Sequence, residues 1–445
     1  MRLEKVRIKG FRNFDDTEVI FQKKTLIIGA NDVGKSNLLY ALRILFDKTI
    51  SEHDLELTES DYNAYSGTDT IEITAYLCEV TEDCLLSTFG SAVKDGKVVI
   101  RYTNQKNGRN NQIFLATWIA KQHLQKNIDH VTFYAIEEPE AHLHPHQQRK
   151  LSAYIQNSFD EQILITTHSP HIASKFEPAS IVRLYSENKY SFASCGGCSE
   201  LLKSVFDNFG YRLNALSAET FFSDGVFLVE GTSEVLFYTA LARELKLDLD
   251  RHNISILSVE GVGFKPYVAI CNALNISWVL RTDNDIFSKT SATSVKKYYA
   301  GISRGIGIVK DIGDNKTGLI EYWNQHSQEN EWPKDAEIPE DAKKLNEYIR
   351  TNIKDLGIFL SAVDLENDLA SSELKDMLMN HYGKRNHDDL VNAMQKKKAE
   401  NMMEFLTKNH KKLSCLEESQ IVEPLTSLIR ITTERTRPDN GERTN

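Results

Sequence analysis

The 445-residue sequence lacks long hydrophobic runs, has few cysteines and carries no excess of positive charge. No segment approaches the ~20 apolar residues that a membrane-spanning helix needs, and the first residues have the pattern of a strand, so we expect neither a transmembrane segment nor a signal peptide. The six cysteines form no disulfide framework, which favours a reducing cytoplasm. The net charge of −10 argues against a generally basic nucleic-acid coat. It does not exclude a nuclease, because metal-dependent nucleases concentrate carboxylates at their sites.

Cys195 and Cys198 have the spacing of metal ligands, but no second pair accompanies them. We therefore interpret this segment as a reduced, solvent-facing turn rather than a zinc site. The length of the chain favours two or three domains over a single core.

A glycine-rich segment, Gly29–Ser36, follows the apolar run 25–28 and precedes residues with helical spacing. The spacing matches G-x-x-x-x-G-K-[ST], the phosphate-binding loop, whose backbone N–H groups surround a triphosphate at the positive end of a helix. We expect Lys35 to contact the β and γ phosphates and Ser36 to ligate Mg²⁺. The alternative is a glycine turn that binds nothing. The nucleotide-binding candidates in this loop are Gly29, Asn31, Gly34, Lys35 and Ser36.

A second part of the same site is predicted from the run 131–136, which we interpret as a buried strand ending in Glu137 and Glu138. In a nucleotide-hydrolysing site the first carboxylate, Glu137, holds Mg²⁺ through water, and the second, Glu138, orients the attacking water. The alternative is an acidic helix N-terminus. A further strand, 162–167, leads to His168, which can contact a γ-phosphate.

The order of strand, phosphate loop, paired glutamates and strand-end histidine resembles the ATPase heads of the ABC class, in the branch of the SMC, RecF and Rad50 proteins. The resemblance implies a mixed α/β head in which two copies sandwich ATP. Two departures stand out. The place of the serine-glycine-glycine signature holds residues 107–112 instead, before a helix expected at 113–125, and no room remains near 103–110 for the long helical insert of those relatives. Both departures concern ATP turnover rather than ATP binding.

After residue 215 apolar strands at 224–229, 254–259 and 278–282 alternate with helical segments, which favours a parallel sheet. Acidic residues follow these strands, at the edge where ligands of such sheets collect. Glu230 and Glu234 share one face at a helix start, and Asp283 and Asp285 flank a single residue. Converging carboxylates repel one another unless cations join them, and Mg²⁺ or Mn²⁺ prefers such oxygen ligands. Two such ions would clamp a phosphodiester. The alternative is an acidic, solvated rim.

The Glu-Gly strand end followed by Asp-x-Asp resembles the Toprim domain. An ABC-type head followed by a Toprim domain is typical of the OLD (overcoming lysogenization defect) family of nucleases, and GFRNF, GANDVGKSN, IEEPE, THSP, VEGTSE, RTDND, VDLENDL and QKKKAENMM look like the nucleases of Gabija anti-phage systems. The resemblance implies metal ligation by Glu230, Glu234, Asp283, Asp285 and Glu366, with Asp364 or Asp368 as accessory. It also implies a catalytic lysine at Lys398, with Lys397 as the one-position alternative. Composition alone would make that lysine run a solvated helix face.

From these observations we expect an ATPase head at 1–215, a Toprim domain at 222–400 with a surface insertion at about 287–350, and a helical C-terminal region with a frayed tail at 401–445. The leading hypothesis is a metal-dependent endonuclease that nicks or cuts double-stranded DNA, using two Mg²⁺ or Mn²⁺ ions, with ATP and Mg²⁺ at a regulatory head. The resemblance implies pairing through the heads, as a dimer or tetramer, and a UvrD-like helicase partner. The alternatives are an ATP-driven DNA-repair protein with a vestigial Toprim domain and the nuclease effector of another defence module, such as a retron.

Overall fold

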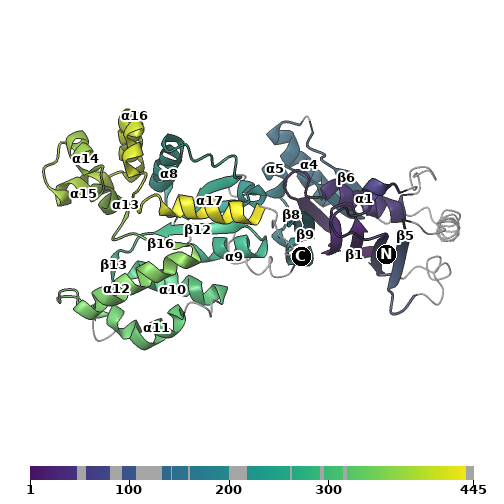
Figure 1. Ribbon diagram of the computed structural model, residues 1–445, viewed down its shortest axis with the longest axis horizontal. Helices are drawn as coiled ribbons and strands as arrows, with labels where there is room; N and C mark the ends of the chain where they lie inside the picture. Colours follow the sequence, from purple (N-terminus) through teal and green to yellow (C-terminus); the bar gives the residue numbers. More distant parts are fainter. Residues whose placement is uncertain are drawn as a thin grey trace, which may run out of the picture. The chain divides into compact units, whose positions relative to one another are not determined.

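The computed structural model describes residues 1–47, 57–80, 93–106, 133–141, 143–158, 161–199, 218–260, 263–290, 295–313 and 318–436. Two compact units divide the chain. The first unit contains Met1–Phe222, Ala273–Asn275 and Arg435–Asn445, and the second contains Ser223–Asn272 and Ile276–Glu434. Figure 1 shows the ribbon of both units and labels several helices and strands of each.

The first unit is built on two sheets. One is antiparallel, with strand order β2-β1-β4-β5, and the other has the order β6-β7-β3-β8-β9, in which only the β8–β9 pair is antiparallel. The strands are β1 (Arg2–Phe11), β2 (Phe14–Ile20), β3 (Lys24–Ile28), β4 (Thr70–Cys78), β5 (Val98–Gln105), β6 (Phe133–Glu137), β7 (Gln162–Thr166), β8 (Ile181–Glu187) and β9 (Tyr190–Ala193). The predicted strand before the paired glutamates is β6, but it is not buried as expected: Tyr134 and Ala135 are exposed, and β6 is the last strand of the sheet as described.

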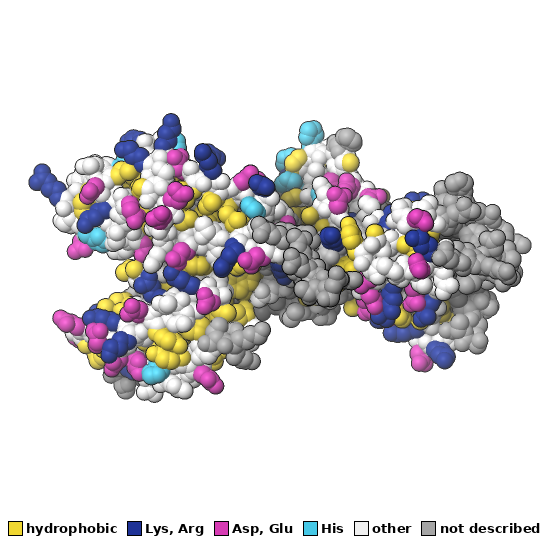
Figure 2. All heavy atoms as spheres, in the orientation of Figure 1, with side chains coloured by type: hydrophobic (Ala, Val, Ile, Leu, Met, Phe, Trp, Pro, Cys, Tyr) yellow, Lys and Arg dark blue, Asp and Glu magenta, His cyan; other side chains and the backbone are white. Residues whose placement is uncertain are grey.

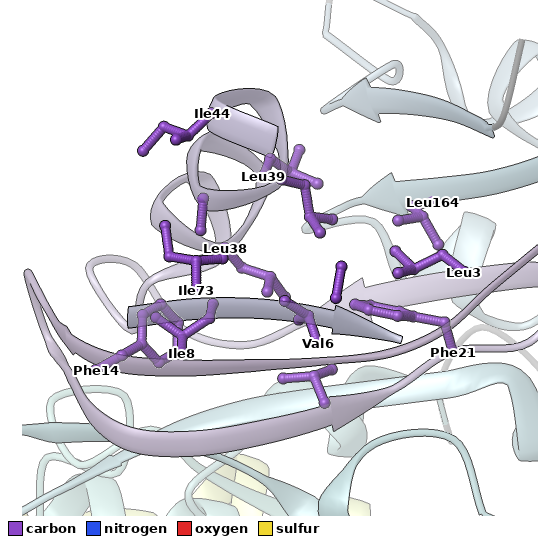
Figure 3. Packing of buried hydrophobic residues seen from close by; sticks show 14 of the residues in the cluster. Leu3, Val6, Ile8, Phe14, Phe21, Leu38, Leu39, Ile44, Ile73 and Leu164 are labelled. Atoms are coloured by element: carbon purple, nitrogen blue, oxygen red, sulfur yellow. The ribbon is translucent and has the colours of Figure 1, made fainter. Parts of the chain in front are cut away.

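The helix α1 (Lys35–Phe46) joins the two sheets in one apolar core. Leu38 and Leu39 of α1 pack with Val6 of β1, Ile73 of β4 and Leu164 of β7 in that core (Figure 3). Because this apolar face of α1 is buried, the helix is held against the sheets at the end of the phosphate loop that follows β3. The remaining helices of the unit are η2 (Glu59–Asp61), α4 (Pro145–Ser158), α5 (Pro170–Ala173), η4 (Pro178–Ser180), η5 (Ser194–Gly196) and η7 (Thr220–Phe222).

The second unit is organised around a four-stranded sheet with the order β11-β10-β12-β16, in which all pairs are parallel. Its strands are β10 (Gly225–Val229), β11 (Ile254–Ser258), β12 (Ser277–Thr282) and β16 (Ile358–Leu360), and α8 (Thr232–Glu244) and α9 (Lys265–Ala273) connect the first three. The expected alternation of strands and helices is therefore present, with every carboxyl end at one edge.

Residues 287–350, expected as a surface insertion, contain a small antiparallel sheet and three α-helices. The elements are β13 (Ile286–Thr290), β14 (Val295–Tyr299), β15 (Trp332–Pro333), α10 (Ala300–Ile312), α11 (Leu319–His326), η8 (Ser327–Asn330) and α12 (Glu340–Asn352), followed by η9 (Ile353–Leu356). One face of α10 is buried, and a Cβ at Gly305 would lie 2.8 Å from Ile353, so the helix packs tightly on the unit rather than standing away from it.

The last helices pack on α8 and the sheet of the second unit. They are α13 (Leu365–Ala370), α14 (Lys375–Tyr382), α15 (His387–Gln395), α16 (Lys398–Asn409), η10 (His410–Leu416) and α17 (Glu423–Thr436). Phe405 of α16 and Leu425 of α17 belong to the same apolar cluster as Phe227 of β10 and Phe237 of α8. The chain after residue 400 therefore shares the core of this unit.

Some sequence predictions lie outside the described residues: the segment 107–112, the helix expected at 113–125 and the end of the tail. Among the described residues, no helix combines the length and the apolar character needed to cross a membrane. On the face shown in Figure 2, dark blue and magenta side chains are interspersed, in keeping with a chain that has no general basic coat.

Candidate nucleotide and metal sites

The phosphate loop has the expected form, a turn between β3 and α1. Gly34 has a φ of 99°, and a Cβ there would lie 2.5 Å from the Asn13 side chain, so the position requires glycine. Lys35 donates from Nζ to the carbonyls of Gly29 at 3.1 Å and Ala30 at 2.7 Å. Burial lowers the pKa of Lys35, and the charge of Glu138 opposes that shift. The lysine thus lies folded over its own loop, and Asn31 is exposed.

The structure brings the other predicted head residues to this loop. Ser36 donates its hydroxyl hydrogen bond to Oε1 of Glu137, at the end of β6. Glu138 has a φ of 44°, a strained conformation that is common at functional turns, and its Oε1 lies 3.1 Å from Nε2 of His168. A hydroxyl, two carboxylates and an imidazole therefore face a loop suited to phosphates, which is the chemistry that binding of a magnesium nucleotide requires.

Sequence reasoning gave no role to Glu140, the third acid of the segment Glu137–Glu140. Its Oε1 accepts hydrogen bonds from the Thr167 hydroxyl at 2.6 Å and from the backbone N–H of His168 at 2.7 Å. Glu140 therefore fixes the turn that carries His168. The three closely spaced acids were the available signal, but only the strand-end position of the first two suggested chemistry.

A second contact network that the sequence did not reveal supports the start of α1. Asn37 donates to Oδ1 of Asn13 at 2.9 Å and accepts from Arg12 at 2.7 Å, and Arg12 also pairs with Asp61 at 2.9 Å. The guanidinium lies 4.5 Å from the centroid of the Tyr40 ring. Arg12 and Asn13 belong to the segment GFRNF, in which they are the polar residues.

Acidic residues follow the parallel strands of the second unit as predicted: Glu230 follows β10, and Asp283 follows β12. Glu234 lies in the first turn of α8 and, like Asp283, is buried. Asp364 and Glu366, at the start of α13, are buried as well. The sheet edge therefore gathers carboxylates that come from three separate parts of the chain.

The electrostatics show that these carboxylates interact. Burial, then the charge of Glu230, raises the pKa of Asp283 to about 8. Burial also raises the pKa of Glu234, and burial together with the charge of Asp364 raises the pKa of Asp285. Within the described residues, Oδ1 of Asp283 is buried without a hydrogen-bond partner. An acid in this condition gains from a bound cation, because the cation removes both the desolvation cost and the repulsion.

Three basic residues already pair with acids of this edge. Lys398 lies 3.0 Å from Glu366, and Arg281 donates to Asp368 at 2.6 Å. Burial opposes ionisation of Lys398, yet the charge and hydrogen bond of Glu366 raise its pKa above the ordinary value. The third pair joins Arg304 of α10 to Glu230.

The geometry distinguishes the residues that the sequence left open. Lys397 is 74% exposed and pairs with Glu400 at 2.9 Å, away from the carboxylates that Lys398 contacts. Asp368 accepts from Arg281 and from the backbone N–H of Ala362 at 3.0 Å, which makes it a structural partner of a buried arginine. Asp364 caps α13 and accepts from Asn367 at 2.8 Å and from the Gln395 side chain at 2.6 Å.

In this state, no group of three or more His, Cys, Asp or Glu side chains in the described part of the chain is arranged to hold a metal ion. The donor set nevertheless fits a hard divalent cation, since it consists of carboxylates and includes the unpartnered oxygen of Asp283.

The predicted Cys195–Cys198 turn is only half solvent-facing. Cys195 is exposed, but Cys198 is buried, with its sulfur 3.6 Å from the Thr25 hydroxyl. Burial raises the pKa of Cys198 to about 11, which keeps it a protonated thiol. The apolar surroundings that bury Cys198 could not be inferred from the spacing of the two cysteines.

Comparison with known proteins gives two domain matches. The AAA ATPase domain matches residues 1–108 and 89–173, and the TOPRIM domain of proteins like the overcoming lysogenization defect protein matches residues 221–285. The endonuclease GajA of Bacillus cereus is 29% identical over 326 residues, which cover 66% of this chain and 51% of GajA. The OLD nuclease of Thermus scotoductus is 30% identical over 164 residues, covering 34% of this chain and 30% of that nuclease. The chain thus spans about half the length of GajA and less of the OLD nuclease.

Among solved structures, the SMC head domain from Thermotoga maritima is 14% identical, with a TM-score of 0.29, and the match covers 43% of this chain and 98% of that domain. The C-terminal region of the Xanthomonas campestris pv. campestris OLD protein is 20% identical, with a TM-score of 0.28, and the match covers 48% of this chain and 97% of that region.

Proposed function

Because this chain is an OLD-family protein, with an AAA ATPase domain followed by an OLD-like TOPRIM domain, we propose that it is a metal-dependent DNA endonuclease whose ATP-binding head controls cleavage. The single observation that carries the proposal is the gathering of Glu230, Asp283 and Glu366 at one sheet edge with Lys398 paired to Glu366. Clustered carboxylates together with a fixed cation are suited to phosphodiester hydrolysis.

In the proposed mechanism Glu230, Glu234, Asp283 and Asp285 hold two Mg²⁺ or Mn²⁺ ions, with Glu366 and, secondarily, Asp364 as further ligands. Bound ions of this kind polarise the phosphate and supply an activated water. Lys398, which lies beside Glu366, would stabilise the developing negative charge on the phosphate and the leaving oxygen. Asp368 stays with Arg281 and holds the end of β12 in place beneath the site.

At the proposed head site, Gly29, Asn31, Gly34 and Lys35 surround the phosphates of ATP, and Ser36 and Glu137 hold its Mg²⁺. Their mutual hydrogen bond supports this role. For hydrolysis, Glu138 must leave His168 and turn toward a water. His168 is then free to contact the γ-phosphate. We propose that nucleotide at this head restrains the nuclease.

The similarity to a protein named as an endonuclease supports nuclease activity. From the resemblance of the sequence motifs to Gabija nucleases we further propose a role in anti-phage defence in the cytoplasm, with double-stranded DNA as substrate. The same resemblance leads us to propose pairing of the chain through its heads into a dimer or tetramer and a UvrD-like helicase as partner. We further propose the domain limits 1–215, 222–400 and 401–445, with an insertion at about 287–350. Whether the chain serves a Gabija system or another defence module, such as a retron, is decided by the neighbouring genes.

The test is cleavage of supercoiled plasmid with Mg²⁺ or Mn²⁺, with and without ATP. Wild type is compared with Glu230→Ala and Lys398→Ala, and Lys397→Ala is the matched control because it removes the neighbouring, exposed lysine. We expect wild type and Lys397→Ala to nick the plasmid, ATP to suppress the reaction, and the other two variants to lose it. Equal nicking by all four proteins would overturn the assignment of the site.

A second function is favoured by one observation, the pairing of Glu230, Glu366 and Asp368 with basic residues. In an ATP-driven DNA-binding or repair protein with a vestigial TOPRIM domain these pairs would be purely structural. Turnover of ATP that DNA stimulates, with no cleavage at any metal concentration, would identify this second function.

A further inference from the structure

Arg304, in α10, reaches the carboxylate edge from the segment that sequence reasoning took for a surface insertion. Its guanidinium bonds to the Glu230 carboxylate and the Thr282 hydroxyl, and Nη1 lies 3.4 Å from the carbonyl oxygen of Asp283. All three partners flank the ends of β10 and β12. The contact therefore lies at the centre of the proposed metal site.

The approach of α10 is built into the fold. Gly301 packs so closely on the edge that a Cβ there would lie 2.5 Å from the Asp283 carbonyl oxygen. Asn284, which is buried, accepts from the backbone N–H of Ile302 at 3.2 Å and donates to Asn346 of α12 at 2.9 Å. Arg304 is three residues after Gly301, on the same side of the helix, so its side chain is carried to Glu230.

The oxygen that Arg304 contacts is crowded with donors. Oε1 of Glu230 also accepts from the Thr282 hydroxyl and from the backbone N–H of Asp283 at 3.0 Å. The guanidinium of Arg304 occupies the position that a metal ion bound to this oxygen would take. Since arginine stays protonated at every physiological pH, only movement of the side chain can clear the position.

The Arg304 side chain is partly open to solvent. It is 29% exposed, so it can leave Glu230 for solvent without breaking the packing of α10. The Glu230 side chain is itself 31% exposed, so water can solvate it when the arginine leaves. Lys398 is 40% exposed, but its departure would leave a Glu366 side chain that is only 3% exposed, and Arg281 is buried. Among the three basic partners of this edge, Arg304 is thus the one that exchanges with a divalent ion at the lowest cost.

We propose that Arg304 is a resident cation that occupies Glu230 when no metal is bound, and that a divalent ion must displace it to load the site. Arg304 then sets the metal concentration at which the nuclease becomes competent. The inference rests on the proposed function, which makes Glu230 a metal ligand.

The test is calorimetric titration of the metal-free, full-length protein with Mn²⁺ in the absence of nucleotide. Arg304→Gln is compared with wild type, and Lys310→Gln is the matched control, because it removes one positive charge from an exposed position of the same helix. Glu230→Gln identifies the part of the binding that belongs to this site. Circular dichroism of each metal-free variant confirms that it is folded.

We expect Arg304→Gln to bind Mn²⁺ about tenfold more tightly than wild type, a gain of about 1.4 kcal/mol, and Lys310→Gln to match wild type. Unchanged or weaker binding by Arg304→Gln, with wild type still binding Mn²⁺, would overturn the inference and make Arg304 an orienting partner of Glu230, while the proposed function would stand. If neither protein binds, or Glu230→Gln binds as tightly as wild type, the proposed metal site itself fails and the inference fails with it.

Discussion

The ammonium group of Lys398 lies 3.0 Å from Oε2 of Glu366, whose side chain is only 3% exposed. Removing the lysine leaves a buried carboxylate without its cation. Because the Lys398 side chain is itself 40% exposed, water replaces part of the lost interaction, and the cost stays below that of a fully buried pair. We expect Lys398→Met to lower the free energy of unfolding of the metal-free protein by about 1–3 kcal/mol.

The urea midpoint in EDTA measures this loss, and Lys397→Met is the control. Its ion pair with Glu400 is exposed on both sides, so its removal should change the free energy of unfolding by at most about 0.5 kcal/mol. Equal losses in the two variants would show that the buried pair has no special weight. If the double variant Lys398→Met/Glu366→Gln regains the free energy of unfolding that Lys398→Met loses, the loss is due to the unpaired charge of Glu366.

The raised pKa of Asp283, about 8, predicts that the metal-free protein loses stability as the pH rises. Between about pH 4 and pH 8 the folded protein keeps a proton on Asp283 that the unfolded chain, with an ordinary aspartate, has released. The free energy of unfolding therefore falls by up to about 1.4 kcal/mol per pH unit across this window.

Urea midpoints measured from pH 5 to pH 8.5 in EDTA give this slope for wild type and for Asp283→Asn, which has no proton to lose at this position. We expect a shallower slope in the variant, and also in wild type saturated with Mn²⁺, since the ion takes the place of the proton. Identical slopes in the two metal-free proteins would mean that Asp283 does not control the dependence.

The parallel sheet and its acidic edge follow from the sequence for a physical reason. Short apolar strands that alternate with helices make parallel pairs, and parallel strands place all their carboxyl ends together. Glu230 and Asp283 directly follow the ends of two such strands, so the alternation of strands and helices is enough to predict that they lie near each other. The same reasoning links the phosphate loop after β3 to Glu137 after β6.

Arg304 and Asn284 show where such reasoning stops. Arg304 is 74 residues from Glu230, in a segment that the sequence led us to expect as a surface insertion. Its place depends on the close packing of Gly301 against Asp283 and on the two hydrogen bonds of the Asn284 side chain, and each of these is a tertiary contact. The pattern of strands and helices in a sequence does not indicate which face of a helix packs against a sheet edge.

Lys35, which lies folded on the carbonyls of Gly29 and Ala30, is expected to serve the head and not the nuclease. Lys35→Ala should nick plasmid with metal at the wild-type rate, and its nicking should no longer respond to ATP. Lys23→Ala, which removes an exposed lysine just before β3, is the control and should keep the response. Loss of nicking itself in folded Lys35→Ala would instead mean that the two activities are inseparable.

Glu140 is expected to control ATP turnover through His168. Its carboxylate accepts hydrogen bonds from the Thr167 hydroxyl and the His168 N–H, and Glu140→Ala leaves both donors without this acceptor, at a cost of about 1–3 kcal/mol. The turn that carries His168 should relax, and with it the contact between His168 and Glu138. ATP turnover should fall by about tenfold or more, because a loss of 1.4 kcal/mol of transition-state stabilisation has that effect.

Binding of a fluorescent ATP analogue should stay within about threefold of wild type, since the loop of Gly29–Ser36 is untouched in Glu140→Ala. Glu140→Gln keeps an accepting oxygen and should recover much of the turnover, and Glu161→Ala, at an exposed position before β7, should leave it unchanged. A parallel loss of binding and turnover in Glu140→Ala would show that the glutamate supports the whole nucleotide site. Loss of turnover alone, with recovery in Glu140→Gln, would establish it as the residue that positions His168.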